Sequence, residues 1–383
     1  MGGPFALAQA AAPGAAPQPR VATGALTISS SHASLIFGAL TSMSGKLTPP
    51  VAGAVVIEGR NADGTWSTLA STSTDAGGAY SKVVSPARTQ ELRARMADNS
   101  ATSVPVVQTV TPRLTFRRIA AAPTFVGSTL IASVGPVGWR GKVRVSVIYA
   151  GRVRATSVGR PAADGKLRLA VPTDGVGRLG VRIELPASNG LSARTVESSV
   201  TATTRSLSQG ARGADVRALL VHLRSLNYHV PGTSTSYGFA QSEVVLAFRK
   251  VHGLSRTYSV DKALWTRLAL ASPERPHFID GKVHIEVNKA RQYLSVVRGN
   301  EVVGTIHVST GASGNTPLGS FHIYQKGNSH LYKFMAFSGN FGIHGYVPVP
   351  AFPASHGCVR EPMWAAAWTY SFANIGTPVY VYR

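Results

Sequence analysis

The chain has 383 residues, a length that fits two to four domains. Its composition is 44% hydrophobic, so globular cores can form, and no run of about 18 apolar residues occurs, so no membrane-spanning helix is expected. The formal net charge is +22, from 39 Lys and Arg against 17 Asp and Glu. Residues 113–205 contain 15 of the basic residues and only 4 acidic ones. Such a field attracts polyanions, for example nucleic acid, acidic lipid or an anionic wall polymer.

Residues 1–22 form a leader that we exclude from the fold. The stretch from Phe5 to Ala12 is apolar and alanine-rich, and Ala8-Gln9-Ala10 resembles the small-x-small site at which a signal peptide is cleaved. The basic region that normally opens such a signal is missing. The leader is therefore either the remnant of an export signal or a disordered Ala/Pro-rich segment.

Two β-rich segments follow the leader. Residues 24–111 alternate apolar and polar side chains in short runs separated by turn clusters such as Asp75-Ala76-Gly77-Gly78. Residues 113–204 repeat this pattern, with Lys and Arg at the outward positions of strands such as 166–169. Short strands at a spacing of about ten residues predict antiparallel sandwiches of the Ig-like type. We interpret both as spacers, and the second also as a basic face that holds the protein on an anionic matrix.

Residues 206–271 change to helical periodicity. Apolar residues at positions 216, 219, 220, 223 and 226 predict one helix, and those at 244, 245, 248 and 251 predict another that Gly253 ends. Ser259 is the expected N-cap of a third helix. The segment resembles the three-helix peptidoglycan-binding domain found beside wall enzymes, in the residues Leu207-Ser208-Gln209-Gly210, Gly213-Ala214-Asp215-Val216, Leu226-Asn227-Tyr228, Tyr237-Gly238-Phe239 and Phe248-Arg249-Lys250. That resemblance implies peptidoglycan binding.

Residues 276–383 return to strand patterns. Residues 283–287 alternate, and the string Arg298-Gly299-Asn300-Glu301 joins two further strands as a hairpin. A helix is expected from Pro362 to Phe372, because proline suits the first turn of a helix. The segment is therefore a mainly β domain with one helix.

The chemistry of the chain centres on its single cysteine, Cys358. A lone cysteine is an inert buried thiol, an intermolecular link or a nucleophile, and the histidines on either side favour the nucleophile. Both His356, two residues before the thiol, and His344, on the far side of a proline-rich loop, are candidates for the base, and the residues alone do not rank them. The consecutive amides of Gly357 and Cys358 are candidates for binding an oxyanion. A zinc site built from His344, His356 and Cys358 lacks a fourth ligand nearby.

Residues 280–383 resemble the L,D-transpeptidase catalytic domain, and this resemblance ranks the histidines. The matching strings are Val308-Ser309-Thr310-Gly311, Thr316-Pro317-Leu318-Gly319-Ser320-Phe321, Ile343-His344-Gly345, Ser355-His356-Gly357-Cys358 and Asn374-Ile375-Gly376-Thr377-Pro378-Val379. In that family the cysteine attacks a diaminoacid carbonyl of one peptidoglycan stem peptide, and an amine of a second stem resolves the acyl-enzyme.

The roles of individual residues follow from the same resemblance. His344 is implied as the base that accepts the thiol proton, and the carbonyl of Gly345 as the group that orients its imidazole. Ser355, His356 and Gly357 are implied as supporting residues around the nucleophile Cys358. Arg360 stands where many family members have Asn, and is expected to contact the stem carboxylate because arginine binds carboxylates with two hydrogen bonds. No cofactor and no metal are expected.

The sequence thus predicts an exported bacterial cell-wall enzyme that cross-links peptidoglycan. Its expected parts are the leader 1–22, β-sandwiches at 24–111 and 113–204, a peptidoglycan-binding three-helix bundle at 206–271 and the catalytic domain at 276–383. Expected partners are peptidoglycan stem peptides and glycan, and anionic wall polymers. One alternative is an L,D-carboxypeptidase, in which water resolves the thioester. Another is a non-catalytic wall or polyanion binder. A nucleic-acid enzyme is disfavoured, because residues 276–383 carry a net charge of only +4.

Overall fold

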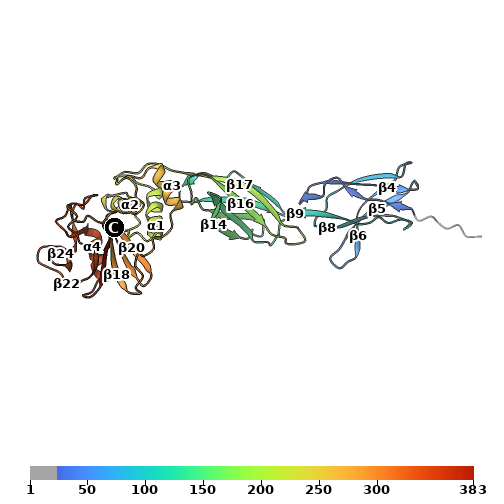
Figure 1. The fold of residues 1–383 in the computed structure, drawn as a ribbon. Helices are drawn as coiled ribbons and strands as arrows, with labels where there is room; N and C mark the ends of the chain where they lie inside the picture. Colours follow the sequence, from blue (N-terminus) through green and yellow to red (C-terminus); the bar gives the residue numbers. More distant parts are fainter. Residues whose placement is uncertain (1–23) are drawn as a thin grey trace, which may run out of the picture. The chain divides into compact units, whose positions relative to one another are not determined.

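The computed structural model describes residues 24–383, so the predicted leader lies outside the described residues (Figure 1). The described chain is a mainly β, multidomain structure with four helices, as expected. It divides into two compact units. The first contains residues up to 113 together with 187–194, and the second contains 114–186 and 195–383. Within the described part of the chain, no helix combines the length and hydrophobicity that a membrane crossing requires.

The first unit consists of two antiparallel-rich sheets around one core. One sheet has the strand order β1-β4-β2 with β7 beside β4, and the other has the order β3-β9-β8-β5-β6. Alternate side chains point inward, and Met43, Val55, Ile57 and Leu92 are fully buried between the strands. The strands are β1 (Ala25–Leu26), β2 (Ser29–Ser30), β3 (Ser34–Ile36), β4 (Thr41–Thr48), β5 (Ala54–Arg60), β6 (Trp66–Ser73), β7 (Ala79–Val84), β8 (Gln90–Met96) and β9 (Val106–Thr111).

The second unit begins with another pair of sheets, of order β10-β12-β15 and β11-β17-β16-β13-β14. Strand β15 shows the alternation most clearly, because Leu167, Leu169 and Val171 are buried while Lys166 and Arg168 are exposed. The strands are β10 (Arg113–Phe116), β11 (Ala122–Pro123), β12 (Ser128–Gly135), β13 (Val143–Tyr149), β14 (Arg152–Gly159), β15 (Lys166–Val171), β16 (Gly177–Leu185) and β17 (Arg194–Thr203).

Three helices share the next core: α1 (Ala214–Ser225), α2 (Phe239–Val251) and α3 (Lys262–Leu270). Gly253 ends α2 as expected: it adopts a φ of 64°, its N–H donates to the Lys250 carbonyl, and the next N–H donates to the Arg249 carbonyl. These two bonds form a Schellman motif. The expected cap of α3 was wrong, because Asp261 and not Ser259 accepts the hydrogen bond from the Leu264 amide. A carboxylate is an equally good N-cap acceptor, and only Asp261 adjoins the first turn.

The C-terminal part has two sheets, of order β20-β19-β18-β26-β21 and β22-β23-β24-β25. The expected hairpin joins β19 to β20 through Gly299 and Asn300, with Arg298 opposite Glu301. Helix α4 (Met363–Phe372) begins directly after Pro362. The strands are β18 (Val283–Asn288), β19 (Tyr293–Arg298), β20 (Glu301–His307), β21 (Gly319–His322), β22 (Gln325–Lys326), β23 (Met335–Ser338), β24 (Phe341–Tyr346), β25 (Val359–Pro362) and β26 (Pro378–Tyr382).

A buried polar network joins helix α2 to this C-terminal part. Glu243 accepts a hydrogen bond from Trp364 Nε1 at 2.6 Å, and its other oxygen lies 3.2 Å from His307 Nε2. Lys250 Nζ donates to the Val308 carbonyl at 2.8 Å and lies 3.4 Å from His307 Nδ1. Burial raises the pKa of Glu243 to about 7 and lowers the pKa values of Lys250 and His307. The helical segment is therefore built into the same unit as the C-terminal sheets.

We predict that Glu243→Ala lowers the free energy of unfolding by about 2–4 kcal/mol, because it leaves the half-buried Trp364 N–H without its acceptor and opens a cavity at the buried Glu243 position. Glu243→Gln is the matched control, since its amide oxygen still accepts from Trp364, and it should cost less than about 1.5 kcal/mol. Urea unfolding of the full chain, followed by tryptophan fluorescence, checks the difference. Equal midpoints for the parent and Glu243→Ala would show that the network contributes nothing to stability.

Candidate functional site

The predicted nucleophile and base are brought together by two parallel strands. Strands β24 and β25 pair with Ile343 opposite Val359 and His344 opposite Arg360. Val359 is buried in the core, so the next residue, Arg360, turns to the other face. His344 shares that face with Arg360, because residues opposite each other in a ladder point the same way. Cys358 lies in the bend directly before β25, two residues before the strand partner of His344.

His344 is held in the tautomer that a general base requires. Its Nδ1 lies 2.9 Å from the Gly345 carbonyl oxygen, which only accepts hydrogen bonds, so Nδ1 carries the proton. The other ring nitrogen, Nε2, then has a free lone pair. Burial lowers the pKa of His344, and the positive charge of Arg360 lowers it further, against the opposing effect of the Gly345 bond. The imidazole is therefore neutral near neutral pH and able to accept a proton.

Cys358 is a free, half-buried thiol at the end of a pinned loop. Its Sγ lies 3.9 Å from the Asn340 carbonyl oxygen, a weak contact that leaves the sulfur available. The four carbonyls of residues 355–358 each accept a hydrogen bond, in order from the Ala312 amide, Asn315 Nδ2 at 3.2 Å, Thr316 Oγ1 at 2.7 Å and Ser355 Oγ at 2.6 Å. All four peptide planes of the loop are thus fixed in orientation.

The two candidate oxyanion amides differ in this structure. The Gly357 N–H donates to Ser355 Oγ at 3.1 Å, so it is already engaged. The Gly357 carbonyl points at the buried Thr316 hydroxyl, and in a trans peptide the following N–H points the opposite way. The Cys358 amide therefore faces away from Thr316.

Position 357 requires glycine, both because of its backbone conformation and because of the atoms around it. Its φ is +156°, and a Cβ built on it would lie 2.2 Å from the Phe341 ring. A side chain at this position therefore has no room beside Phe341. Gly345 is equally enclosed, since an added Cβ would meet Tyr332, Met363 and Ala366 at 2.8–3.0 Å.

The remaining predicted residues lie around this pair. Ser355 is buried and braces the loop through the two bonds given above. The His356 side chain is exposed, and its carbonyl is the group that Asn315 holds. Arg360 lies with its guanidinium 4.1 Å from the Tyr346 ring centre and donates to the Ala354 carbonyl at 3.1 Å.

Two supporting features were not assigned a role from the sequence. Asn315 and Thr316 hold the carbonyls of His356 and Gly357, each 41 residues further along the chain. Thr316 lies in one of the strings that match the L,D-transpeptidase family, whereas no sequence pattern pointed to Asn315. Glu361, three residues after Cys358, is fully buried behind the strand pair and accepts a hydrogen bond from Thr369 Oγ1 at 2.7 Å. Its other oxygen is buried and has no partner among the described residues, and burial raises its pKa to about 8. Among residues 24–383, no three His, Cys, Asp or Glu side chains gather to hold a metal ion.

A free thiol directly before one strand and a neutral imidazole on the strand paired with it are the components that cysteine acyl transfer requires. The family model for the L,D-transpeptidase catalytic domain, YkuD, matches residues 282–381. Residues 282–381 are thus an L,D-transpeptidase catalytic domain, as the sequence motifs indicated. No curated protein matches the chain.

Several solved structures are similar to parts of the chain. An L,D-transpeptidase fragment from Xylanimonas cellulosilytica is 29% identical, with a TM-score of 0.44 over 47% of this chain and 98% of the other. An L,D-transpeptidase from Stackebrandtia nassauensis is 23% identical, with a TM-score of 0.30 over 46% and 95%. One from Mycobacterium smegmatis is 12% identical, with a TM-score of 0.24 over 71% and 100%. The family assignment depends on the match to residues 282–381, because these overall similarities are low.

We predict that Gly357→Ala reduces reactivity of the thiol by at least about 10-fold, because the new Cβ collides with Phe341 and displaces the loop that carries Cys358. Gly232→Ala is the matched control, since no atom lies within 4 Å of its built Cβ and its φ is ordinary. The rate of alkylation by iodoacetamide on the folded protein measures the effect. A Gly357→Ala rate equal to that of the parent would show that the loop tolerates the displacement.

The raised pKa of Glu361 makes stability depend on pH. The folded state holds this proton up to about pH 8, whereas an unfolded Glu releases it near 4.5. The contribution to stability is therefore complete below pH 4.5 and is lost as the pH rises toward 8. Glu361→Gln stays neutral, so we predict that its melting temperature exceeds that of the parent by a few degrees at pH 8 and matches it at pH 4.5. Scanning calorimetry at both pH values is the measurement. A constant difference between the two proteins across this range would contradict the assignment.

Proposed function

We propose that the chain is an exported cell-wall enzyme that forms peptidoglycan cross-links by L,D-transpeptidation. The observation that carries this proposal is the buried, neutral His344, whose Nδ1 is fixed by the Gly345 carbonyl and whose strand pairs with the strand that Cys358 directly precedes. The family of residues 282–381 supplies the substrate class, peptidoglycan stem peptides.

The first half of the proposed reaction forms a thioester. His344 Nε2 takes the proton of the Cys358 thiol, and the thiolate attacks the diaminoacid carbonyl of the donor stem. The carbonyl electrons move to oxygen, and the Cys358 amide, which faces away from Thr316, donates a hydrogen bond to that oxyanion. The intermediate then collapses, its C–N bond breaks, and the imidazolium returns its proton to the leaving amine.

The second half transfers the acyl group. An amine of a second stem attacks the thioester, His344 removes its proton, and the cysteine leaves as the thiolate and is reprotonated. The new amide is the cross-link. Water in place of the amine gives the carboxypeptidase outcome, so the products distinguish the two reactions. Arg360, stacked on Tyr346 at the same face, is proposed to contact the carboxylate of the donor stem.

The other segments are proposed to bring this chemistry to the wall. Residues 206–271 bind peptidoglycan and raise the concentration of stems near the thiol. Residues 24–111 and 113–204 act as spacers. The network at Glu243 and Lys250 supports a close association of the binding segment with the catalytic domain, since both residues lie on α2 and their partners lie at β20 and α4.

We predict that Cys358→Ala abolishes cross-linking and that His344→Ala lowers its rate by about 100- to 10,000-fold, the range for a lost general base. His356→Ala should lose less than about 10-fold, because its side chain is exposed, and the exposed His330→Ala serves as the matched control. Mass spectrometry of products from defined tetrapeptide muropeptides measures all four variants. Cross-linking by Cys358→Ala would contradict the mechanism, and an equal loss in His344→Ala and His330→Ala would remove His344 as the base. Free tripeptide without cross-linked dimer would identify a carboxypeptidase.

A further inference from the structure

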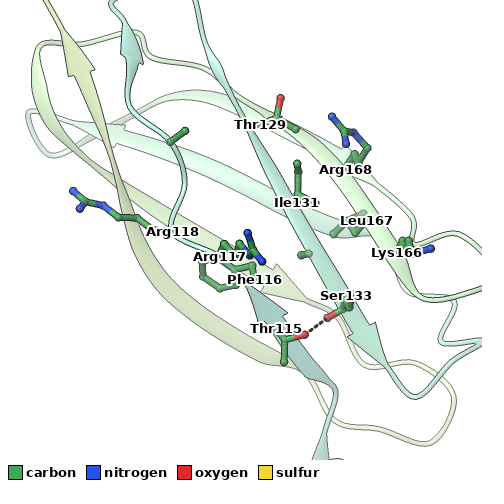
Figure 2. A pocket seen from close by; sticks show the side chains of 12 residues that line it. Thr115, Phe116, Arg117, Arg118, Thr129, Ile131, Ser133, Lys166, Leu167 and Arg168 are labelled. Carbon is green, nitrogen blue, oxygen red and sulfur yellow. Dashed lines mark hydrogen bonds between the residues drawn. The ribbon is translucent and has the colours of Figure 1, made fainter.

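A groove of about 810 Å³ lies on the second β segment, on the exposed face of the β10-β12-β15 sheet (Figure 2). The register of β12 and β15 places Ile131 opposite Arg168 and Ser133 opposite Lys166, so these side chains share one face. Figure 2 shows Ile131 near the middle of the groove, between Arg168 and the segment that carries Phe116 and Arg117. The groove uses no residue of the L,D-transpeptidase domain.

The charge of the groove is almost entirely positive. Arg117, Arg118, Lys166 and Arg168 line it, and none of its lining residues is acidic. Lys166 is neutralised by Asp164 at 2.8 Å. The three arginines form no ion pair with any described residue, and Arg117, Arg118 and Arg168 are all exposed. Guanidinium groups bind phosphate and carboxylate with paired hydrogen bonds, so the three arginines offer unpaired binding groups for anions here.

Two other arginines of the same β segment have acidic partners: Arg144 lies 3.9 Å from Glu184, and Arg182 lies 2.9 Å from Glu197. Exposed basic residues elsewhere on these strands, such as Arg152 and Arg178, form no ion pair among the described residues either. What distinguishes the groove is that its unpaired arginines gather around one apolar floor.

The floor of the groove is apolar. Ile131 is 57% exposed, although it sits in the middle of a strand, and Phe116 is half-buried beside it. An apolar strip flanked by cations does not fit a small inorganic anion, which needs no floor. It fits an extended chain that lays uncharged backbone on Ile131 and presents anionic groups to both sides.

We propose that this groove binds a linear polyanion whose phosphate or carboxylate groups are separated by uncharged carbon backbone. The groups meet Arg117 and Arg118 on one side and Arg168 on the other, while Ile131 contacts the backbone between them. The concave shape favours a single extended chain over a flat lipid surface. The binding is independent of the thiol chemistry, so it stands or falls separately from the proposed cross-linking activity.

Calorimetric titration of the full-length protein tests this proposal with poly(glycerol phosphate) and with polygalacturonate, and with neutral dextran as the uncharged control. The groove variant is Arg117→Gln, Arg118→Gln and Arg168→Gln combined. The matched variant, Lys142→Gln, Arg152→Gln and Arg178→Gln combined, removes the same charge from exposed positions that do not line the groove. We expect the groove variant to bind at least about 10-fold more weakly at 50 mM NaCl and the matched variant to lose less than about 3-fold. The better of the two polyanions identifies phosphate or carboxylate as the preferred group.

The salt dependence of the affinity and a substitution of Ile131 in the groove floor give two further readouts. Loss of three anion contacts should reduce the slope of log affinity against log salt concentration by about two to three, because fewer counterions are released on binding. Ile131→Asn should weaken binding by about 3-fold without changing this slope, because it removes apolar contact and no charge. Calorimetric melting confirms that each variant is folded, and Arg168→Gln alone replaces the triple variant if that variant melts early. Equal losses in the two triple variants, or no binding of either polyanion, would overturn the proposal.

Discussion

The parallel pairing of β24 with β25 determines where the reactive groups of this protein lie. It sets His344 level with Arg360 and leaves Cys358 at the start of the neighbouring strand. The same backbone that positions His344 also orients it, because the acceptor for Nδ1 is the carbonyl of the next residue, Gly345. The orientation of the His344 imidazole thus depends on strand geometry and on the backbone of the next residue. A side chain at Gly345 would collide with Tyr332, Met363 and Ala366, so glycine is required at this position.

The loop before β25 is as strongly constrained as the strands. Every carbonyl from Ser355 to Cys358 has a partner, so the loop has little freedom to reorient its amides. Preorganised amide dipoles stabilise developing charge without the cost of reorganisation during the reaction. The partners Asn315 and Thr316 follow β20, and β20 in turn contacts helix α2 through the buried Glu243, Lys250 and His307. Residues 307–316 therefore contact the helical segment at one end and the loop of Cys358 at the other.

Much of this arrangement was predictable from the sequence, because it depends on local patterns. Helical spacing predicted α1 and α2, Gly253 predicted the end of α2, and the string around Gly299 predicted the β19–β20 hairpin. The strings around His344 and Cys358 identified the catalytic domain. The structure brings these strings onto adjacent strands, which the sequence alone could not establish.

The features that escaped prediction depend on contacts between distant residues. Glutamate and lysine usually lie at the surface, so nothing in the local pattern places Glu243 and Lys250 in the core. Both contact His307, which lies 64 residues after Glu243 and 57 residues after Lys250. The cap of α3 was assigned to Ser259 because serine is a good N-cap, and the choice between it and Asp261 depends on where the first turn begins. The roles of Thr316 and Phe341 beside Gly357 depend on sheet packing that no local spacing reveals.

The central claim is that Cys358 carries the acyl group during the reaction. The most direct measurement incubates the full-length protein with a tetrapeptide donor stem and no acceptor amine, quenches it in acid, and maps the modified peptide by mass spectrometry. The account predicts a single adduct on Cys358, equal in mass to the donor less its C-terminal residue and released by hydroxylamine as a thioester is. Turnover of the donor with an unmodified Cys358, or with the acyl group on another residue, would contradict it.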